Sequence, residues 1–173
     1  MLDVAGPRHQ EDAGADALEL VRRLFPICRS LTGDGVRETF DVLEEHIPLV
    51  RREIASGTKV FDWFVPDEWN IWEAHITAPD GTRVVDFQRL NLHVVGYSEP
   101  VRATMPLETL RERLHTLPDQ PDLIPYRTSY YHRTWGFCLS HRQLEALEPG
   151  DYEVVIDSTL EPGSLSYAEL MVE

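Results

Sequence analysis

Lysine is almost absent from this sequence. Lys59 is the only lysine among 16 basic residues, and 30 acidic residues leave a formal net charge of −14. Nucleic acids and anionic membranes both bind through a concentrated basic surface, which this composition does not supply. We therefore expect neither as a partner of this chain.

Cysteine and long apolar runs are also scarce. The two cysteines, Cys28 and Cys138, lie far apart and make no disulfide framework. No apolar run approaches the roughly 20 residues that a membrane-spanning helix needs. The first residues lack the basic-then-apolar order of a signal peptide. These absences predict a cytoplasmic protein.

The N-terminal third has a helical pattern. Residues 1–15 are rich in glycine, proline and acidic residues and predict a disordered leader. Apolar residues then recur at helical spacing from Asp16, a predicted N-cap, to Cys28, and again over 36–47. The turn residues of 30–35 separate these two segments. We expect both helices to bury their apolar faces in a core.

The pattern becomes extended after residue 48. A strand is predicted near 50–54, and Ser56 marks a boundary. Asp80-Gly81 between extended runs predicts a hairpin of strands 73–77 and 83–87. Further strands are predicted at 91–97, 151–159 and 164–172, the last two as a hairpin, with helices at 107–114, capped by Thr104, and at 140–147. The fold class is α+β: two N-terminal helices followed by a β-rich domain.

Aromatic, cationic, thiol and imidazole groups are concentrated between residues 124 and 143, in the run IPYRTSYYHRTWGFCLSHRQ. Guanidinium forks and tyrosine hydroxyls suit the binding of carboxylate, phosphate or carbonyl groups. We predict that Arg127, Tyr130, Tyr131 and Trp135 bind substrate. The alternative is a half-buried strand around Trp135, with Arg127 paired to an internal acid such as Asp122 or Asp157.

Cys138 and His141, with His132 nearby, raise the question of a metal site. Structural zinc sites need four ligands, usually as two close pairs, and this spacing does not supply them. A Cys/His nucleophile pair would need a lowered thiol pKa. We interpret Cys138 as a small buried side chain and His141 as a residue near a helix start.

Three of the four tryptophans, Trp63, Trp69 and Trp72, lie close together in the sequence. Such a cluster is compatible with a platform on which a sugar ring stacks. Core packing is the more frequent use of tryptophan in β-rich domains.

Several long runs carry a resemblance to a known family. These are LFPICRSLTGDGVRETF, SGTKVFDWFVPDEWNI, NLHVVGYSEPV, LHTLPDQPDLIPYRTSYYHRTWGFCLSH and DYEVVIDSTLEPGSLSYAEL. Together they resemble the aminopeptidase-like family of bacteria and archaea, formerly described as a domain of unknown function. Its members look like di-zinc aminopeptidases with an inserted domain and a C-terminal winged helix. The resemblance implies that 16–55 and 162–173 belong to the aminopeptidase-like domain and that 56–161 form the inserted domain.

The resemblance also implies where the metal ligands are. In the family, a histidine-rich metal-binding run follows the strand that ends this chain at Glu173. We therefore assign no catalytic residue and no metal ligand here. We expect zinc in the complete family member and none in this chain, which would be an inactive N-terminal part.

The implied activity of the complete protein is zinc-dependent removal of an N-terminal residue from a peptide or small amide substrate. The alternative is a non-catalytic module that binds a ligand such as a carbohydrate, or that mediates assembly into a homo-oligomer.

Overall fold

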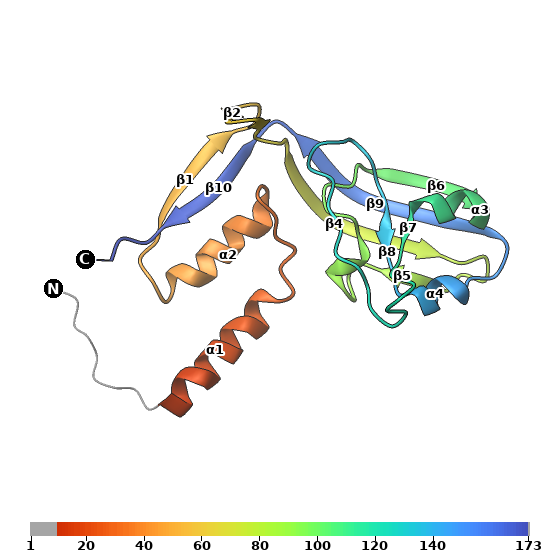
Figure 1. Cartoon of the computed structure of the whole chain (residues 1–173), viewed down its shortest axis with the longest axis horizontal. Helices are drawn as coiled ribbons and strands as arrows, with labels where there is room; N and C mark the ends of the chain where they lie inside the picture. Colours follow the sequence, from red (N-terminus) through yellow and green to blue (C-terminus); the bar gives the residue numbers. More distant parts are fainter. Residues whose placement is uncertain (1–9, 173) are drawn as a thin grey trace.

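The computed structural model describes residues 10–172. Two helices come first, α1 at Gln10–Leu24 and α2 at Asp34–Glu44. Strand β1 at Val50–Ala55 then pairs antiparallel with β10 at Ser164–Glu169, so that Val50 lies opposite Glu169. Figure 1 shows α2 beside this two-stranded ribbon and α1 farther from it.

A four-stranded antiparallel sheet forms the other part of the molecule. Its strand order is β5-β4-β9-β6, with β4 at Glu68–Thr77, β5 at Arg83–Asp86, β6 at Val101–Pro106 and β9 at Asp151–Glu161. As Figure 1 shows, β4 and β9 run from the ribbon into this sheet, and α3, α4, β7 and β8 lie over it. The fold class is thus α+β, as the sequence predicted.

The main core lies under the short elements that cover this sheet. These are η1 at Asn91–His93, α3 at Leu107–Leu110, η2 at Arg111–Arg113, α4 at His141–Glu145, and the parallel pair of β7 at Leu114–His115 with β8 at Phe137–Cys138. Strands β2 at Lys59–Val60 and β3 at Trp63–Phe64 form a separate small pair. Ile76, Leu110 and Phe137 have no exposed surface, as expected for residues that exclude water from a core.

The predicted turn at Asp80-Gly81 is confirmed, and so is a short helix that starts at His141. Asp80-Gly81 forms the turn between β4 and β5, where Thr82 N donates to Asp80 Oδ1 at 2.9 Å. Ser140 caps α4: its hydroxyl accepts from Gln143 N at 3.1 Å, and the Gln143 side chain accepts from Ser140 N at 2.9 Å. This reciprocal pair is a capping box.

The first helix begins earlier than predicted. Residues 10–15 belong to α1, so Asp16 lies inside the helix and is not its N-cap. Alanine has the highest helix propensity, and Ala13, Ala15 and Ala17 favour continuing the helix through this stretch. The predicted leader is wrong over 10–15, and its residues 1–9 lie outside the described part.

The expected burial of both helices is also wrong for α1. Leu18, Val21 and Phe25 are 50%, 58% and 65% exposed, although they share one apolar face. Helix α2 does bury Val36 and Thr39. Periodicity identified the apolar face of α1 but does not show whether another element covers it.

Three further predictions were wrong because distant residues decide strand pairing. Residues 91–97 do not form a strand: they contain η1 and make only isolated bridges, such as Val94 with Phe137. Strands β9 and β10 are not a hairpin, since β9 pairs with β4 and β6 while β10 pairs with β1. The strand considered around Trp135 is reduced to Phe137–Cys138.

The predicted helix at 107–114 is shorter, and strands β2, β3, β6 and β7 were not predicted. The α-helical part ends at Leu110, and its N-cap residue is Pro106. Thr104 lies in the unpredicted strand β6.

In the part of the chain between residues 10 and 172, no helix is long and apolar enough to cross a membrane. The domain limits at Ser56 and Glu161 remain a prediction.

Candidate ligand-binding site

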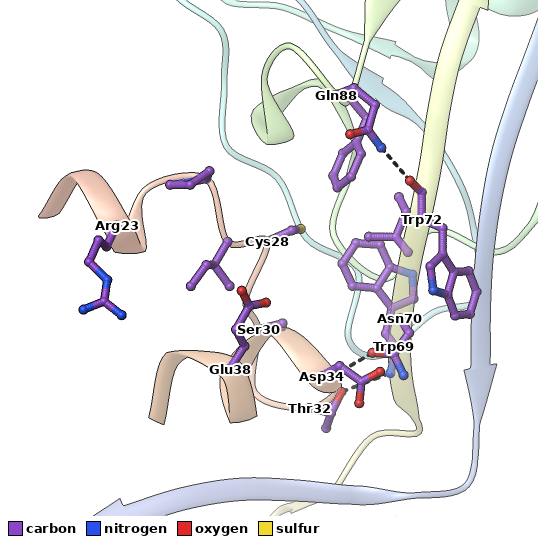
Figure 2. Close-up of a pocket in the computed structure, with 15 residues that line it drawn as sticks. Arg23, Cys28, Ser30, Thr32, Asp34, Glu38, Trp69, Asn70, Trp72 and Gln88 are labelled. Carbon is purple, nitrogen blue, oxygen red and sulfur yellow. Dashed lines mark hydrogen bonds between the residues drawn. The ribbon is translucent and has the colours of Figure 1, made fainter. Parts of the chain in front are cut away.

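A cavity of about 420 Å³ lies between the α1–α2 connection and strand β4 (Figure 2). We call it the Trp72 cavity. Its volume falls in the range of small-molecule sites. It is lined by Arg23, Pro26, Ile27, Cys28, Ser30, Thr32, Asp34, Gly35, Glu38, Trp69, Asn70, Ile71, Trp72, Phe87 and Gln88.

Two glycines let the connecting segment approach its neighbours closely. A Cβ at Gly33 would lie 2.2 Å from Trp69 O, and a Cβ at Gly35 would lie 2.0 Å from Cys28 O. The approach is fixed by Asp34 N, which donates to Asn70 Oδ1 at 2.7 Å. Figure 2 shows this contact at the base of the cavity. The turn residues of 30–35 therefore position the cavity wall.

A buried hydrogen-bond network supports the same wall. Thr32 Oγ1 lies 2.7 Å from Tyr97 OH and accepts from Trp69 N at 3.2 Å. Trp69 Nε1 donates to Ser98 O at 2.9 Å, and the Trp69 ring stacks on Tyr97 with centroids 5.6 Å apart. Trp69 is therefore a core residue, and its ring is not available as a platform.

Trp72 is the tryptophan of this cavity that a ligand can reach. Its side chain is 53% exposed, and the Gln88 amide donates to Trp72 O at 2.6 Å. In Figure 2 the Gln88 amide contacts the Trp72 backbone carbonyl, and the Trp72 ring lies on the other side of β4 from the α1–α2 connection. An exposed indole ring can stack against the face of a sugar.

The charged groups of the cavity differ in their pairing. Arg23 donates both terminal nitrogens to the Glu45 carboxylate at 2.7 and 2.8 Å. Burial raises the pKa of the Cys28 thiol to about 11, against the weaker opposing effect of Arg29. The thiol is therefore protonated at neutral pH and is a poor nucleophile.

A second, smaller cavity of about 250 Å³ shares Cys28 and Trp69 with the first and reaches Tyr126. Burial, followed by Tyr130, raises the pKa of Tyr126 to about 12. This phenol is neutral at physiological pH and could only donate or accept a hydrogen bond.

The structure separates the four predicted substrate-binding residues. Tyr130 and Tyr131 line a cavity of about 190 Å³. Trp135 lines a different one of about 400 Å³, and Arg127 lines none of the cavities described here. Arg133 lies on both cavities and pairs with Asp67 at 3.0 Å and Glu99 at 3.3 Å. A substrate-binding role of the four residues stays a prediction.

The alternative pairing of Arg127 with Asp122 or Asp157 is not observed in residues 10–172. Asp122 instead pairs with Arg142. Tyr130 packs against the core, with its ring centroid 4.8 Å from that of Tyr97, whereas Tyr131 is 71% exposed.

The residues present do not fit a zinc ion. Within the described range there is no group of three His, Cys, Asp or Glu side chains that could hold a metal. Cys138 is fully buried, which raises its thiol pKa to about 11. His141, the first residue of α4, has Nδ1 3.0 Å from Thr116 Oγ1. The interpretation of Cys138 as a small buried side chain is confirmed.

Sequence reasoning missed the Trp72 cavity because its walls come from 23–38 and 69–88. The sequence pattern predicts helices and a turn in the first segment and a hairpin in the second. The available signals were the two glycines of the turn at 30–35 and the tryptophan cluster. Neither the glycines nor the tryptophans indicate that residues 23–38 contact residues 69–88.

Comparisons with known proteins identify the family. Residues 68–159 match the model described as domain of unknown function (DUF2172). This match covers more than half of the chain, which therefore belongs to that family.

One relative is a Clostridium acetobutylicum protein provisionally named as a polysaccharide biosynthesis protein with an aminopeptidase-like domain. It is 51% identical over 165 residues, which are 95% of this chain and 38% of the relative. A crystal structure provisionally described as a peptidase from the same organism is 53% identical and has a TM-score of 0.88. The similarity covers 91% of this chain and 37% of that one. This chain thus corresponds to a part of aminopeptidase-like proteins.

Proposed function

We propose that this chain is a substrate-binding part of a zinc-dependent aminopeptidase-like hydrolase that removes N-terminal residues. The observation that carries the proposal is the 51% identity over 95% of the chain to a relative with an aminopeptidase-like domain in its provisional name. Since the residues described here do not fit zinc, we propose that the ligands belong to the rest of such a protein. No catalytic step is derived for this chain.

The contribution of this chain would be to bind and orient the substrate. The Trp72 cavity offers the amides of Asn70 and Gln88 and the carboxylates of Asp34 and Glu38. Holding a substrate in one orientation lowers the entropic part of a reaction barrier. Arg127, Tyr130, Tyr131 and Trp135 remain further predicted contacts on other faces.

The first expected outcome concerns the chain by itself. The purified 173-residue chain should not hydrolyse aminoacyl-anilides and should retain no stoichiometric zinc after dialysis against a weak chelator. The longer Clostridium acetobutylicum relative, supplied with zinc, should hydrolyse them, because it contains the region that this chain does not match. The measurements are release of the aniline and elemental analysis.

Two results would contradict the proposal. One is zinc bound at one equivalent or more by this chain, which would make Cys138 and His141 ligand candidates again. The other is a folded, zinc-loaded relative that hydrolyses none of a broad set of aminoacyl-anilides and aminoacyl amides.

Carbohydrate binding is a second candidate, favoured by the exposed Trp72 ring. Aromatic stacking is worth about 0.5–1.5 kcal/mol, so Trp72→Ala should weaken sugar binding by up to about tenfold. Binding of glucose, galactose and N-acetylglucosamine can be measured by isothermal titration calorimetry. The matched control is Trp63→Ala, since Trp63 does not line this cavity. Equal binding by both variants and the parent would exclude stacking on Trp72.

A further inference from the structure

Strand β9 has one edge that its neighbour covers only in part. On one side it pairs with β4 over residues 153–161, and on the other side it pairs with β6 only as far as Ile156, which lies opposite Val101. Figure 1 shows β9 continuing past the start of β6 toward the β1–β10 ribbon. Within the described part of the chain, residues 158–161 therefore have a strand partner on one side only.

The backbone groups along this open edge are unused. In an antiparallel strand, successive residues direct their backbone N–H and C=O groups to opposite edges, so every second residue of 158–161 directs them away from β4. Among residues 10–172, no backbone group of a turn or loop bonds to these four residues. Unpaired strand groups of this kind are a template for a further strand.

The open edge lies in a groove, the cavity of about 400 Å³ that Trp135 lines. Residues 99–101 close one end of it, where Ser98 O accepts from Ser158 Oγ at 2.9 Å. The chain then turns away from β9, since Glu99 N donates to Thr134 O at 2.9 Å. This turn leaves space beside the end of β9 where a neighbouring strand would otherwise lie.

Trp135 supplies a fixed apolar wall to the groove. The Arg113 guanidinium carbon lies over the Trp135 ring, 5.1 Å from its centroid, and holds the ring from one face. Val101 and Leu160, both half-buried, add to the apolar lining. When a peptide adds to a sheet edge, backbone hydrogen bonds supply affinity and side-chain pockets of this kind supply specificity. The groove thus has both parts that an extended peptide needs.

The charged groups of the groove carry an excess of negative charge. Arg133 is already paired with Glu99 at 3.3 Å and with Asp67 at 3.0 Å. Glu161, the last residue of β9, is exposed and has no ion pair within the described range. Opposite charges on two binding surfaces favour their association. The groove therefore suits a ligand with a basic side chain.

We propose that residues 158–161 bind an extended peptide with a basic residue by strand addition, in the place beside β9 that β6 leaves at Val101. The peptide backbone bonds to the open edge, an apolar side chain packs on Trp135, and the basic residue faces Glu161. This site names a contact for a peptide substrate and in that sense rests on the proposed function. Strand addition is measured as binding without hydrolysis, so the two proposals can fail separately.

The probe is a fluorescein-labelled, amidated pentapeptide of sequence TVKVT, and its binding to the full chain is measured by fluorescence anisotropy. Two further versions carry N-methyl groups on alternate residues, one on the valines and the other on the threonines and the lysine. Only one set of N–H groups can face β9. One version should therefore bind within about twofold of the parent peptide and the other at least about tenfold more weakly. Equal binding by the two versions, or no binding of the parent peptide up to about 1 mM, would overturn strand addition.

Two variants and hydrogen exchange locate the site. Glu161→Lys should weaken binding of the peptide about two- to fivefold, as expected for loss of an exposed charge pair. Glu153→Lys is the matched control, because Glu153 is exposed on the same strand where β6 covers the edge, and it does not line the groove. Bound peptide should slow amide exchange within 158–161 but not within 151–156. Equal effects of the two variants, or slower exchange only elsewhere, would contradict the proposal.

Discussion

Gly33→Ala is expected to destabilise the protein by about 3–4 kcal/mol. Gly33 has φ of 93°, a left-handed conformation that costs an L-residue about 1–2 kcal/mol. The added Cβ would also lie 2.2 Å from Trp69 O and 2.7 Å from Asn70 Oδ1. Real Cβ atoms do not approach a backbone oxygen this closely, so the segment carrying Asp34 would have to move away from β4.

The matched control is Gly81→Ala. Gly81 has φ of 86°, but a Cβ there would meet nothing within 4 Å. Gly81→Ala should lower the free energy of unfolding by about 1 kcal/mol, the cost of placing alanine at a positive φ alone. Urea unfolding followed by tryptophan fluorescence measures both variants, and Trp69 reports directly on the contact with Gly33. If both variants lost the same stability, the close approach of Gly33 to β4 would not contribute to the effect of Gly33→Ala.

Signals contained in a few consecutive residues were predicted well from the sequence. Asp80-Gly81 turns the chain within two residues, as predicted. The short helix after Ser140 was predicted too, although its Ser140–Gln143 capping box was not. Their chemistry is complete over three or four positions, so no distant residue is needed to specify it. The α+β class was also predicted from local signals, because the spacing of apolar residues changes from helical to extended after residue 48.

Pairing between distant residues was not predicted. Val50 in β1 meets Glu169 in β10, and no pattern within 164–169 distinguishes this partner from the adjacent β9. The Trp72 cavity has the same origin, since Asp34 N reaches Asn70 across the chain. Composition alone selected Arg127, Tyr130, Tyr131 and Trp135, but proximity in sequence did not bring them to one cavity.

The second large expected effect is that of Glu68→Gln at the junction of α2, β4 and β10. Both terminal nitrogens of Arg37 donate to the Glu68 carboxylate at 2.7 Å, and Ser164 N donates to Oε2 at 3.0 Å. The Glu68 side chain is only 18% exposed. The Arg37 hydrogen bond is the largest of the effects that lower the pKa of Glu68 to about 2.

Because the folded-state pKa lies below the ordinary value of 4.5, Glu68 stabilises the folded state above about pH 4.5. This contribution is lost as the pH falls toward 2. With allowance for partial solvent screening, Glu68→Gln should cost about 2 kcal/mol at pH 7. Glutamine keeps an acceptor for Ser164 N, but its NH2 group replaces an oxygen that accepts from Arg37. The part of the loss that varies with pH therefore reports the charge. The variant and the parent should converge in stability at low pH.

Urea unfolding of the parent and Glu68→Gln from pH 7 down to about pH 2.5 measures this convergence. Glu19→Gln is the control, because the Glu19–Arg22 pair is 3.7 Å long with both side chains 67% exposed. Such exposed pairs contribute little, so this variant should match the parent within a few tenths of a kcal/mol at every pH. If Glu68→Gln were less stable by the same amount at all pH values, the loss would come from packing, and the charge of Glu68 would not be what joins α2 to the strands.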